Sequence, residues 1–328
     1  MKDRLLPLVD EFPSKTILVF GDLLLDQFLF GEISRISREA PVLILRYRET
    51  ISAAGGGANA ANNAASLGAQ IITVGVVGAD KVGDQLRELL PPGAKLVTEQ
   101  QYSTPTKIRI LGGSAHSSRQ QIVRIDHEST LGDRPDLHKR LANLLEAALE
   151  QAHGVVVSDY GNGTVAPRLM EMITASCATR KIPVVVDSRF GLLDYRNVTA
   201  MTPNISEVEE ALHEKLGQDE KRIEIVGKQL RQRSGLAALL ITRGRFGMTL
   251  LEEADRVTHI PIFGSDEVAD VTGAGDTVIA TFTTALAAGA SFFEAAMLAN
   301  YAAGLAVMKR GTATISPDEL REAVATDQ

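Results

Sequence analysis

The sequence predicts an α/β protein built on a largely parallel sheet that helices cover on both faces. Short apolar, β-branched runs alternate along the chain with Ala- and Leu-rich stretches of helical length, such as 137–152 and 292–308. Near-continuous apolar strands are typical of a parallel sheet buried on both sides. Several runs end in Asp, Gly or Thr, which places polar groups at the carboxyl edge, where open α/β sheets bind ligands. The expected strands are 16–20, 71–78, 155–159, 183–187 and 238–242.

Two segments depart from this alternation and predict a second, smaller sheet. Residues 26–48 and 101–125 contain strand-like runs with turns, and residues 107–110 alternate with a period of two. The LGGSAHSS stretch at 111–118 predicts a hairpin loop. We expect 26–48 and 101–125 to form a β-sheet lid over a main domain made of 1–25, 49–100 and 126–328. The alternative is that these strands only extend one sheet and have no lid function.

Composition and charge favour a folded protein that acts on a small molecule. Of the 328 residues, 45% are hydrophobic and 23% are charged, and no apolar run reaches the roughly 18 residues typical of a membrane span. The formal charge of −7 argues against a nucleic-acid partner, which needs a basic surface. Cys177 is the only cysteine, and the first 15 residues include acids and lack a signal-peptide core. We therefore expect a cytoplasmic protein with no nucleic-acid or membrane partner.

The strongest chemical signal is DVTGAGDT, which begins at Asp270 and leads directly into an Ala- and Thr-rich helix. Gly273, Ala274 and Gly275 would present backbone N–H groups at the helix N-terminus, where an anion is stabilised. Asp276 follows in the first turn, where an acidic residue is also an ordinary helix cap. A carboxylate beside a phosphate-binding turn is the arrangement that phosphoryl transfer requires.

A second glycine cluster, AAGGGANAANNAASLG, begins at Ala53 and enters a helix of small residues. Small side chains let a ligand approach the backbone, and Asn59 could bond sugar hydroxyls. The cluster also matches GxGxxA, with Asp80 after the following strand, which would indicate a dinucleotide site. Close helix packing without a ligand is a further alternative.

Two more strand-to-helix turns carry candidate polar groups. In MTPNISEVEEAL, Asn204 and Glu207 are three residues apart and could point into one pocket or form a helix cap. In ITRGRFGM, Thr242 and Gly244 follow a strand, as a nucleotide contact or a tight turn. The sequence contains no GxxxxGK[ST], GxSxG or HExxH motif, which argues against a P-loop kinase, a serine hydrolase and a zinc protease.

The order and spacing of GGGAN (55–59), TPNISE (202–207) and DVTGAGDT (270–277) resemble those of the ribokinase-like (PfkB) carbohydrate kinases, over roughly residues 15–318. This resemblance implies a three-layer α/β/α ribokinase-like fold with a small β-sheet lid. It also implies ATP with Mg²⁺ as the phosphoryl donor and a sugar hydroxyl as the acceptor.

Matched position by position, the resemblance makes Asp276 the catalytic base and Gly273, Ala274 and Gly275 the anion hole. Glu207 would act indirectly on Mg²⁺, and Asp270 would lie near a monovalent-cation site, which makes K⁺ a candidate cation. The positions matching nucleotide- and phosphate-site residues are Asn204, Glu207, Thr242, Gly244 and Asn300. The positions matching sugar-contacting residues are Asp26, Gly55, Gly56 and Asn59.

Within this family, the segments 21–31, 34–42, 158–163 and 309–316 look most like D-glycero-β-D-manno-heptose-7-phosphate kinases, the kinase half of a bifunctional heptose enzyme. That resemblance implies phosphorylation of the anomeric hydroxyl to give a 1,7-bisphosphate. The chain departs from the pattern at Asn162, where those kinases carry Lys, and at DSRFG, where they carry a DPKG-like segment. Arg189 could replace the lost charge. The chain ends without a nucleotidyltransferase module, so we expect a stand-alone kinase.

A phosphorylated acceptor would need a cationic clamp. The candidates in and around the lid are Arg35, Arg38, Lys107, Arg109, Arg119 and Arg124. We expect Lys107, Arg109, Asp159 and Arg189 to contact the substrate. The open edges of the lid predict a homodimer through it. The alternatives are another ribokinase-like kinase, acting on ribose, fructose, a hexose phosphate or adenosine, or a non-catalytic ligand-binding homologue.

Overall fold

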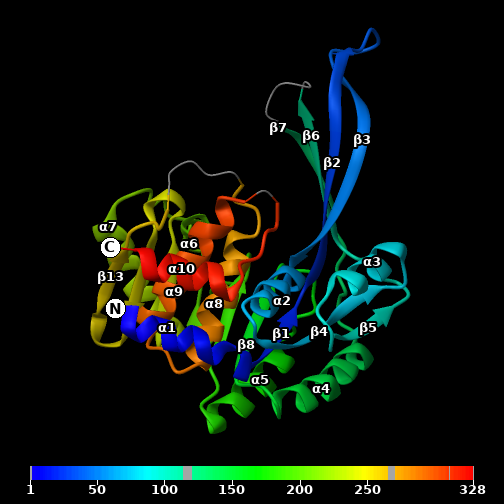
Figure 1. Ribbon diagram of the computed structural model, residues 1–328. Helices are drawn as coiled ribbons and strands as arrows, with labels where there is room; N and C mark the ends of the chain where they lie inside the picture. Colours follow the sequence, from blue (N-terminus) through cyan, green and yellow to red (C-terminus); the bar gives the residue numbers. More distant parts are fainter. Residues whose placement is uncertain (1, 114–119, 265–269, 310, 328) are drawn as a thin grey trace.

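The computed structural model describes residues 2–113, 120–264, 270–309 and 311–327, and it confirms the α/β fold class (Figure 1). Within those residues nine strands form the main sheet in the order β13-β12-β11-β10-β9-β8-β1-β4-β5. In this sheet β11, β10, β9, β8, β1, β4 and β5 are parallel to one another, and β12 and β13 are antiparallel to their neighbours. The bounds are β1 Thr16–Gly21, β4 Gln70–Gly78, β5 Lys95–Glu99, β8 Gly154–Asp159, β9 Val184–Ser188, β10 Ala200–Met201, β11 Ala238–Thr242, β12 Met248–Glu252 and β13 Val257–Ile260.

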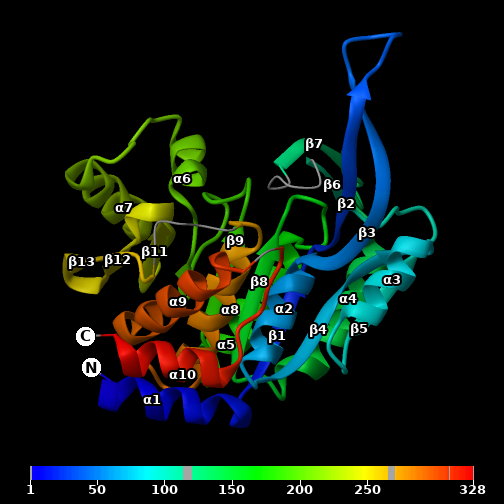
Figure 2. The ribbon, with the colours of Figure 1, turned by 45° about the horizontal axis from the view of Figure 1, so that its top comes forward.

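Helices cover both faces of this sheet, which gives the three expected layers (Figures 1 and 2). Residues of β1 alternate between the two cores: Ile17 and Val19 pack with one set of helices, and Leu18 and Phe20 with the other. The first set is α1 (Lys2–Glu11), α2 (Gly57–Ser66), α3 (Lys81–Leu89), α8 (Ala274–Ala287), α9 (Phe292–Val307) and α10 (Pro317–Thr326). The second set is α4 (Pro135–Leu149), α5 (Pro167–Arg180), α6 (Ile205–Leu212) and α7 (Glu220–Ser234). None of the helices in the described part of the chain is long and apolar enough to cross a membrane.

A second sheet projects away from this body (Figure 1). Its strands follow the order β3-β2-β6-β7, with bounds β2 Leu23–Ile36, β3 Leu43–Gly56, β6 Thr106–Gly113 and β7 Gln120–His127. The sheet is longer than the segments 26–48 and 101–125, because β2 begins two residues after β1 and β3 runs directly into α2. Residues 114–119 of the expected hairpin loop lie outside the described residues.

The two faces of the second sheet differ in chemistry. Residues paired across neighbouring strands point to the same face, and successive residues point to opposite faces. Arg109 pairs with Arg124 and shares the face of Lys107, whereas Ile108 pairs with Ile125 on the other face. Along these parts of β6 and β7, one face therefore carries charge and the other carries Ile108 and Ile125.

Gly21 is the last residue of β1 and lies where the body and the second sheet meet, two residues before β2. A Cβ atom at this position would lie 1.9 Å from the backbone oxygen of Ser158, so only glycine fits. The close approach of β1 and β8 also brings Asp22 next to the loop that follows β8, where its carboxylate accepts the backbone N–H of Tyr160 at 2.8 Å.

We predict that Gly21→Ala lowers the free energy of unfolding by about 3 kcal/mol, because the added methyl group forces two buried strands apart. The measurement is urea unfolding followed by circular dichroism. Gly217→Ala is the matched control: its φ of +55° is also positive, but its Cβ would meet nothing within 4 Å. The control substitution should lower the free energy of unfolding by only about 1 kcal/mol. Equal losses in the two variants would contradict the role of the close strand contact.

Candidate active site

The carboxyl ends of the central strands open into a cavity of about 480 Å³ between the body and the second sheet. The second sheet, the strand ends and the start of α8 all contribute to its walls. Its lining includes Lys107, Arg109, Arg124, Asp159, Tyr160, Asp187, Arg189, Asn204, Glu207, Thr242, Gly273, Ala274, Gly275 and Asp276. Most of the residues that the sequence pointed to therefore meet in one place.

Asp276 lies in the first turn of α8 and is only 5% exposed. The helix begins after Gly273, whose φ of +79° turns the chain into it. A Cβ at Gly273 would lie 2.5 Å from the side-chain nitrogen of Asn59, so glycine lets α8 pack closely against α2. Asn59 Nδ2 then donates to Asp276 Oδ2 at 2.8 Å, and the Tyr160 hydroxyl donates to Oδ1 at 3.2 Å.

Burial controls the acidity of this carboxyl group. Removal from water raises the pKa of Asp276 to about 7, and the hydrogen bond from Asn59 partly opposes that rise. A carboxylate whose pKa lies near neutral pH is suited to accept a proton from a weak acid such as a hydroxyl. The first N–H groups of α8 surround the same position and would stabilise a nearby anion.

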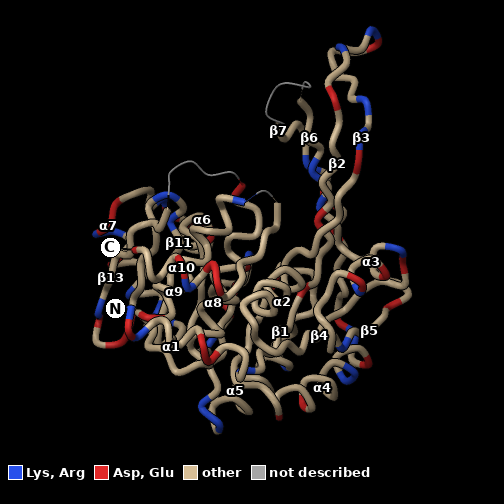
Figure 3. The backbone as a smooth tube through the Cα atoms, viewed as in Figure 1, with Lys and Arg blue, Asp and Glu red and all other residues tan. Residues whose placement is uncertain are grey.

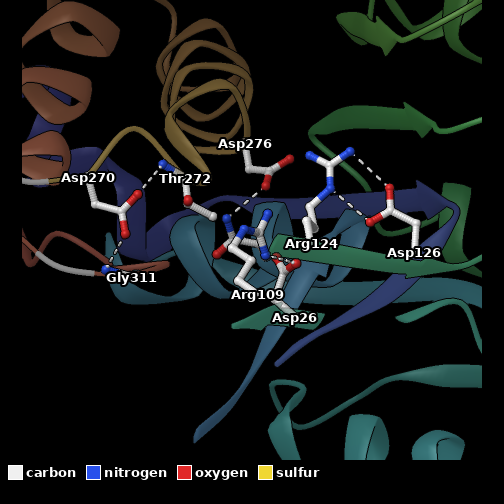
Figure 4. A network of polar contacts seen from close by, with 9 residues as sticks. Asp26, Arg109, Arg124, Asp126, Asp270, Thr272, Asp276 and Gly311 are labelled. Atoms are coloured by element: carbon white, nitrogen blue, oxygen red, sulfur yellow. Dashed lines mark hydrogen bonds and ion pairs between the residues drawn. The ribbon is translucent and has the colours of Figure 1, made fainter. Parts of the chain in front are cut away.

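Cations gather on the wall formed by the second sheet. Arg109 Nη1 pairs with Asp26 Oδ1 at 2.5 Å, and both side chains are largely buried. Arg124 forms two hydrogen bonds with Asp126, at 2.8 and 2.9 Å. Figure 4 shows both ion pairs in the same view as Asp276, and Figure 3 marks basic positions along the part of the second sheet near the body.

Lys107 and Arg189 complete this positive wall. Burial lowers the pKa of Lys107, and the nearby Arg189 charge adds to the effect. Arg189 is exposed, follows β9, and lines the cavity together with Lys107. The structure therefore brings the expected substrate-contacting cations together.

The wall formed by the end of β9 and the start of α6 carries two carboxylates with raised pKa values. Burial and the neighbouring charges of Glu207 and Asp276 hold the pKa of Asp187 well above its usual range. Burial is also the main cause of the raised pKa of Glu207. Asp187 belongs to none of the sequence motifs that indicated the site, and its position at the end of an expected strand was the signal that could have found it.

Asn204 and Glu207 form a helix cap and also line the cavity. The Asn204 side chain accepts the Glu207 N–H at 2.9 Å, and Glu207 Oε2 accepts the Asn204 N–H at 2.8 Å. This capping box fixes the start of α6. The capping alternative is therefore present in the structure, and it leaves both residues at the cavity wall.

A smaller pocket of about 160 Å³ adjoins the cavity. The two share Thr242, Val271, Ala274 and Gly275. Apolar side chains of β12, α8 and α9 form much of the pocket, and Gly244 and Asn300 also line it. Asn300 is nearly buried and donates to the backbone oxygen of Pro261 at 2.9 Å. The pocket is therefore largely apolar and adjoins the cavity at the start of α8.

Several expected residues lie behind the cavity wall. Gly55 lies against Asp26, where a Cβ would be 2.6 Å from Oδ2, and Gly56 is the N-cap of α2. Asp270 joins two loops by accepting the N–H groups of Thr272 at 2.9 Å and Gly311 at 3.1 Å (Figure 4).

The carboxylate of Asp159 is already engaged, although the residue lines the cavity. It accepts the hydroxyls of Ser188 at 2.8 Å and Tyr195 at 2.6 Å, and the N–H of Gly161 at 3.0 Å. These bonds fix the loops that follow β8 and β9.

Three clamp candidates are not brought to the cavity. Arg35 and Arg38 are exposed and lie toward the far end of the β2–β3 hairpin, because β2 extends well beyond the body. Arg119 lies outside the described residues.

The dinucleotide alternative fails on geometry. The GxGxxA segment begins in the last two residues of β3, a strand of the second sheet, and does not follow a buried strand of the main sheet. Asp80 caps α3 by accepting the Gly83 N–H at 2.7 Å, and it also bonds Thr104. Its carboxylate is therefore used in local structure.

Known proteins with the same architecture include ribokinase from Arabidopsis thaliana complexed with ribose and ATP, and phosphofructokinase-2 from Escherichia coli in complex with substrates and products. Their TM-scores are 0.71 and 0.75, at 18% and 20% sequence identity. Each alignment covers 95% of this chain, with 99% of the ribokinase and 98% of the phosphofructokinase. At this identity they establish the ribokinase-like fold.

Sequence relatives are closer. The chain is 41% identical over 308 residues to the bifunctional protein HldE of Geobacter sulfurreducens, and 41% identical over 327 residues to that of Pseudomonas paraeruginosa. These alignments cover 92% and 98% of this chain but only 61% and 66% of the relatives. The chain thus spans less than two thirds of their length.

The family is established by a match over nearly the whole chain. The model of the pfkB family carbohydrate kinases matches residues 14–319. That range includes the buried Asp276, the glycine turn before it and the cavity they face. The chain therefore belongs to the pfkB family of carbohydrate kinases and is a phosphotransferase that acts on a sugar hydroxyl.

Proposed function

We propose that this kinase transfers the γ-phosphoryl group of ATP to the anomeric hydroxyl of D-glycero-D-manno-heptose 7-phosphate and releases ADP and the 1,7-bisphosphate. The observation that carries the proposal is the position of Asp276, between a cation-lined cavity wall and the adjoining pocket. A phosphorylated acceptor fits the cation-lined wall, and an adenine ring fits the adjoining pocket. The bifunctional HldE relatives support a heptose substrate.

In the proposed reaction, Asp276 is the general base. Its ionised carboxylate takes the proton of the anomeric hydroxyl while that oxygen bonds to the γ-phosphorus. The bond from the γ-phosphorus to the bridging oxygen of ADP breaks at the same time. The N–H groups of Gly273, Ala274 and Gly275 stabilise the charge on the transferred group.

The proposed nucleotide site combines the adjoining pocket with the acidic wall. Thr242, Gly244 and Asn300 would contact the nucleotide, and Asn204 would lie near its phosphates. Asp187 and Glu207 fit Mg²⁺, because this ion prefers oxygen ligands and both carboxylates line the cavity. Bound Mg²⁺ would neutralise charge on the phosphates, with Glu207 acting indirectly.

A monovalent cation belongs to the same proposal. Asp270 ties the loop before α8 to Gly311, so an ion such as K⁺ beside it would stabilise the anion-binding turn. A structure of Escherichia coli phosphofructokinase-2, which shares this fold, is in complex with potassium.

The acceptor would lie along the second sheet. Asp26, with Gly55 and Gly56 behind it, and Asn59 surround the sugar side of the site, and Asp159 holds the loop next to it. Its phosphate would be bound by Lys107, Arg109, Arg124 and Arg189, of which Arg109 is already oriented by Asp26. An unphosphorylated sugar or a nucleoside would offer these cations no anionic group to bind.

We predict that Asp276→Asn lowers kcat by roughly 10²- to 10⁴-fold, because the amide cannot accept the hydroxyl proton. Circular dichroism and ATP binding, measured by calorimetry, should remain those of the wild type. Unchanged turnover would show that another group is the base.

We predict that heptose 7-phosphate is converted in preference to fructose 6-phosphate, ribose and adenosine when each is incubated with the protein and MgATP. Mass spectrometry of the products is the measurement. Arg189→Met should raise the KM for heptose 7-phosphate by roughly 10-fold, because one charged contact is lost, and should leave the KM for ATP unchanged. Preference for another acceptor would agree with the kinase activity and contradict the heptose substrate.

We further propose that segments 26–48 and 101–125 act as a lid and that two copies pair through it in the cytoplasm. The support is the apolar face of the second sheet, where Val123 and Ile125 are 45% and 43% exposed. They lie on the face opposite to Arg124, so pairing would cover them and leave the cavity wall accessible. Exposed strand edges add a further reason to pair.

We predict that Val123→Lys combined with Ile125→Lys converts a dimer to a monomer, because two buried charges would face the partner. The measurement is light scattering after size-exclusion chromatography. Gln85→Lys combined with Ala175→Lys adds the same charge at exposed helix positions and should preserve the dimer. A double variant of β7 that remains dimeric would reject this interface.

A further inference from the structure

Tyr160 connects the base to the second sheet, and sequence analysis gave it no function. It lies in the loop after β8 and lines the cavity with Asp276. Its hydroxyl donates to Asp276 Oδ1 at 3.2 Å, while Asn59 occupies Oδ2. One donor on each oxygen fixes the plane of the carboxylate and leaves further lone pairs for a substrate hydroxyl.

Hydrogen bonds to a buried carboxylate fix the backbone of Tyr160. Asp22, which is fully buried, accepts the N–H groups of Tyr160 at 2.8 Å, Asn162 at 3.0 Å and Thr164 at 3.1 Å. Three bonds to one buried carboxylate leave this turn little freedom. The ring of Tyr160 therefore projects from a fixed backbone.

The ring itself contacts the second sheet. Lys107 Nζ, from β6, lies 4.6 Å from the centre of the Tyr160 ring, within the range of a cation–π contact. The same face of β6 and β7 also carries Arg109 and Arg124, which are proposed to bind the acceptor phosphate. One side chain thus touches both the base and the acceptor-binding wall.

We propose that Tyr160 is a positioning residue that orients the Asp276 carboxylate through its hydroxyl and supports Lys107 through its ring. The inference rests on the proposed function, because it gives Asp276 the role of the base and Lys107 that of an acceptor contact. It predicts separate effects for the two parts of the side chain: the hydroxyl affects turnover, and the ring affects acceptor binding.

The surroundings of Asp276 allow the hydroxyl to be tested directly. The polar and charged groups that act on it are Asn59 from α2, Tyr160 from the loop after β8, Asp187 from β9, and Asp26 and Lys107 from the second sheet. Tyr160→Phe removes one donor to the ionised carboxylate and leaves the other groups in place. The pKa of Asp276 should therefore rise, by about half to one unit.

The first experiment measures this titration by ¹³C NMR of Asp side-chain carboxyl groups in the protein without substrates, with Asp276→Asn to assign the signal. Tyr195→Phe is the matched control, because its hydroxyl donates to Asp159 and not to Asp276. We expect an upward shift in Tyr160→Phe and none in Tyr195→Phe. An unchanged titration in Tyr160→Phe would overturn the proposed contact.

The second experiment compares Tyr160→Phe with Tyr160→Leu in steady-state kinetics. Phe retains the ring, so kcat should fall by about 10-fold with an unchanged acceptor KM, and the acid limb of the kcat profile should move to higher pH. Leu removes the ring as well, so the acceptor KM should also rise. Equal acceptor KM values in the two variants would reject the support of Lys107.

The two experiments separate failure of this inference from failure of the proposed function. A wild-type protein that phosphorylates no acceptor in the panel would overturn the proposed function, while the titration would still test the contact between Tyr160 and Asp276. If the wild type is active and Tyr160→Phe has the same Asp276 titration and the same kcat as the wild type, only the inference about Tyr160 would be overturned.

Discussion

The removal of Asp276 from water is the constraint on which the rest of the site depends. A carboxyl group at the first turn of a helix would ordinarily be ionised and solvated, and here burial raises its pKa to about 7. That burial requires α8 to pack closely against α2, which in turn requires glycine at position 273. The small residues of both helices therefore have a chemical consequence: they keep water away from the carboxylate and leave the side opposite Asn59 open to the cavity.

The charges around this carboxylate are arranged by the fold itself. Parallel strands deliver Asp159 and Asp187 to the same edge of the main sheet, whereas Lys107, Arg109 and Arg124 come from a separate sheet with its own ladder. The acidic wall is fixed to the core, and the basic wall is attached through β2 and β3, which continue directly from β1 and into α2. A substrate with negative charge at both ends is complementary to this separation.

The sequence predicted the sheet well where strands are long and apolar, and less well elsewhere. The strands at 16–20, 71–78, 155–159, 183–187 and 238–242 are confirmed. The two-residue β10 and the antiparallel β12 and β13 lack a distinctive period, so the pattern did not reveal them. Among polar groups, motif residues such as Asp276 and Asn59 were found, but Asp22 and Tyr160 were not. Their interactions connect positions 138 and 116 residues apart, which no local pattern records.

The alternation along the first part of β6 has a consequence for how such a chain can vary. Because Lys107 and Arg109 line the cavity while Ile108 and Ile110 lie on the other face of the sheet, residues on one face can be replaced without disturbing the other. Insertion or loss of a single residue is different, since it would exchange the two faces from that point onward. The lengths of these strands are therefore more tightly constrained than the identities of many side chains they carry. Away from β-bulges, we expect related sequences to differ in this sheet by side-chain replacements, or by insertions and deletions of two residues that keep each face as it is.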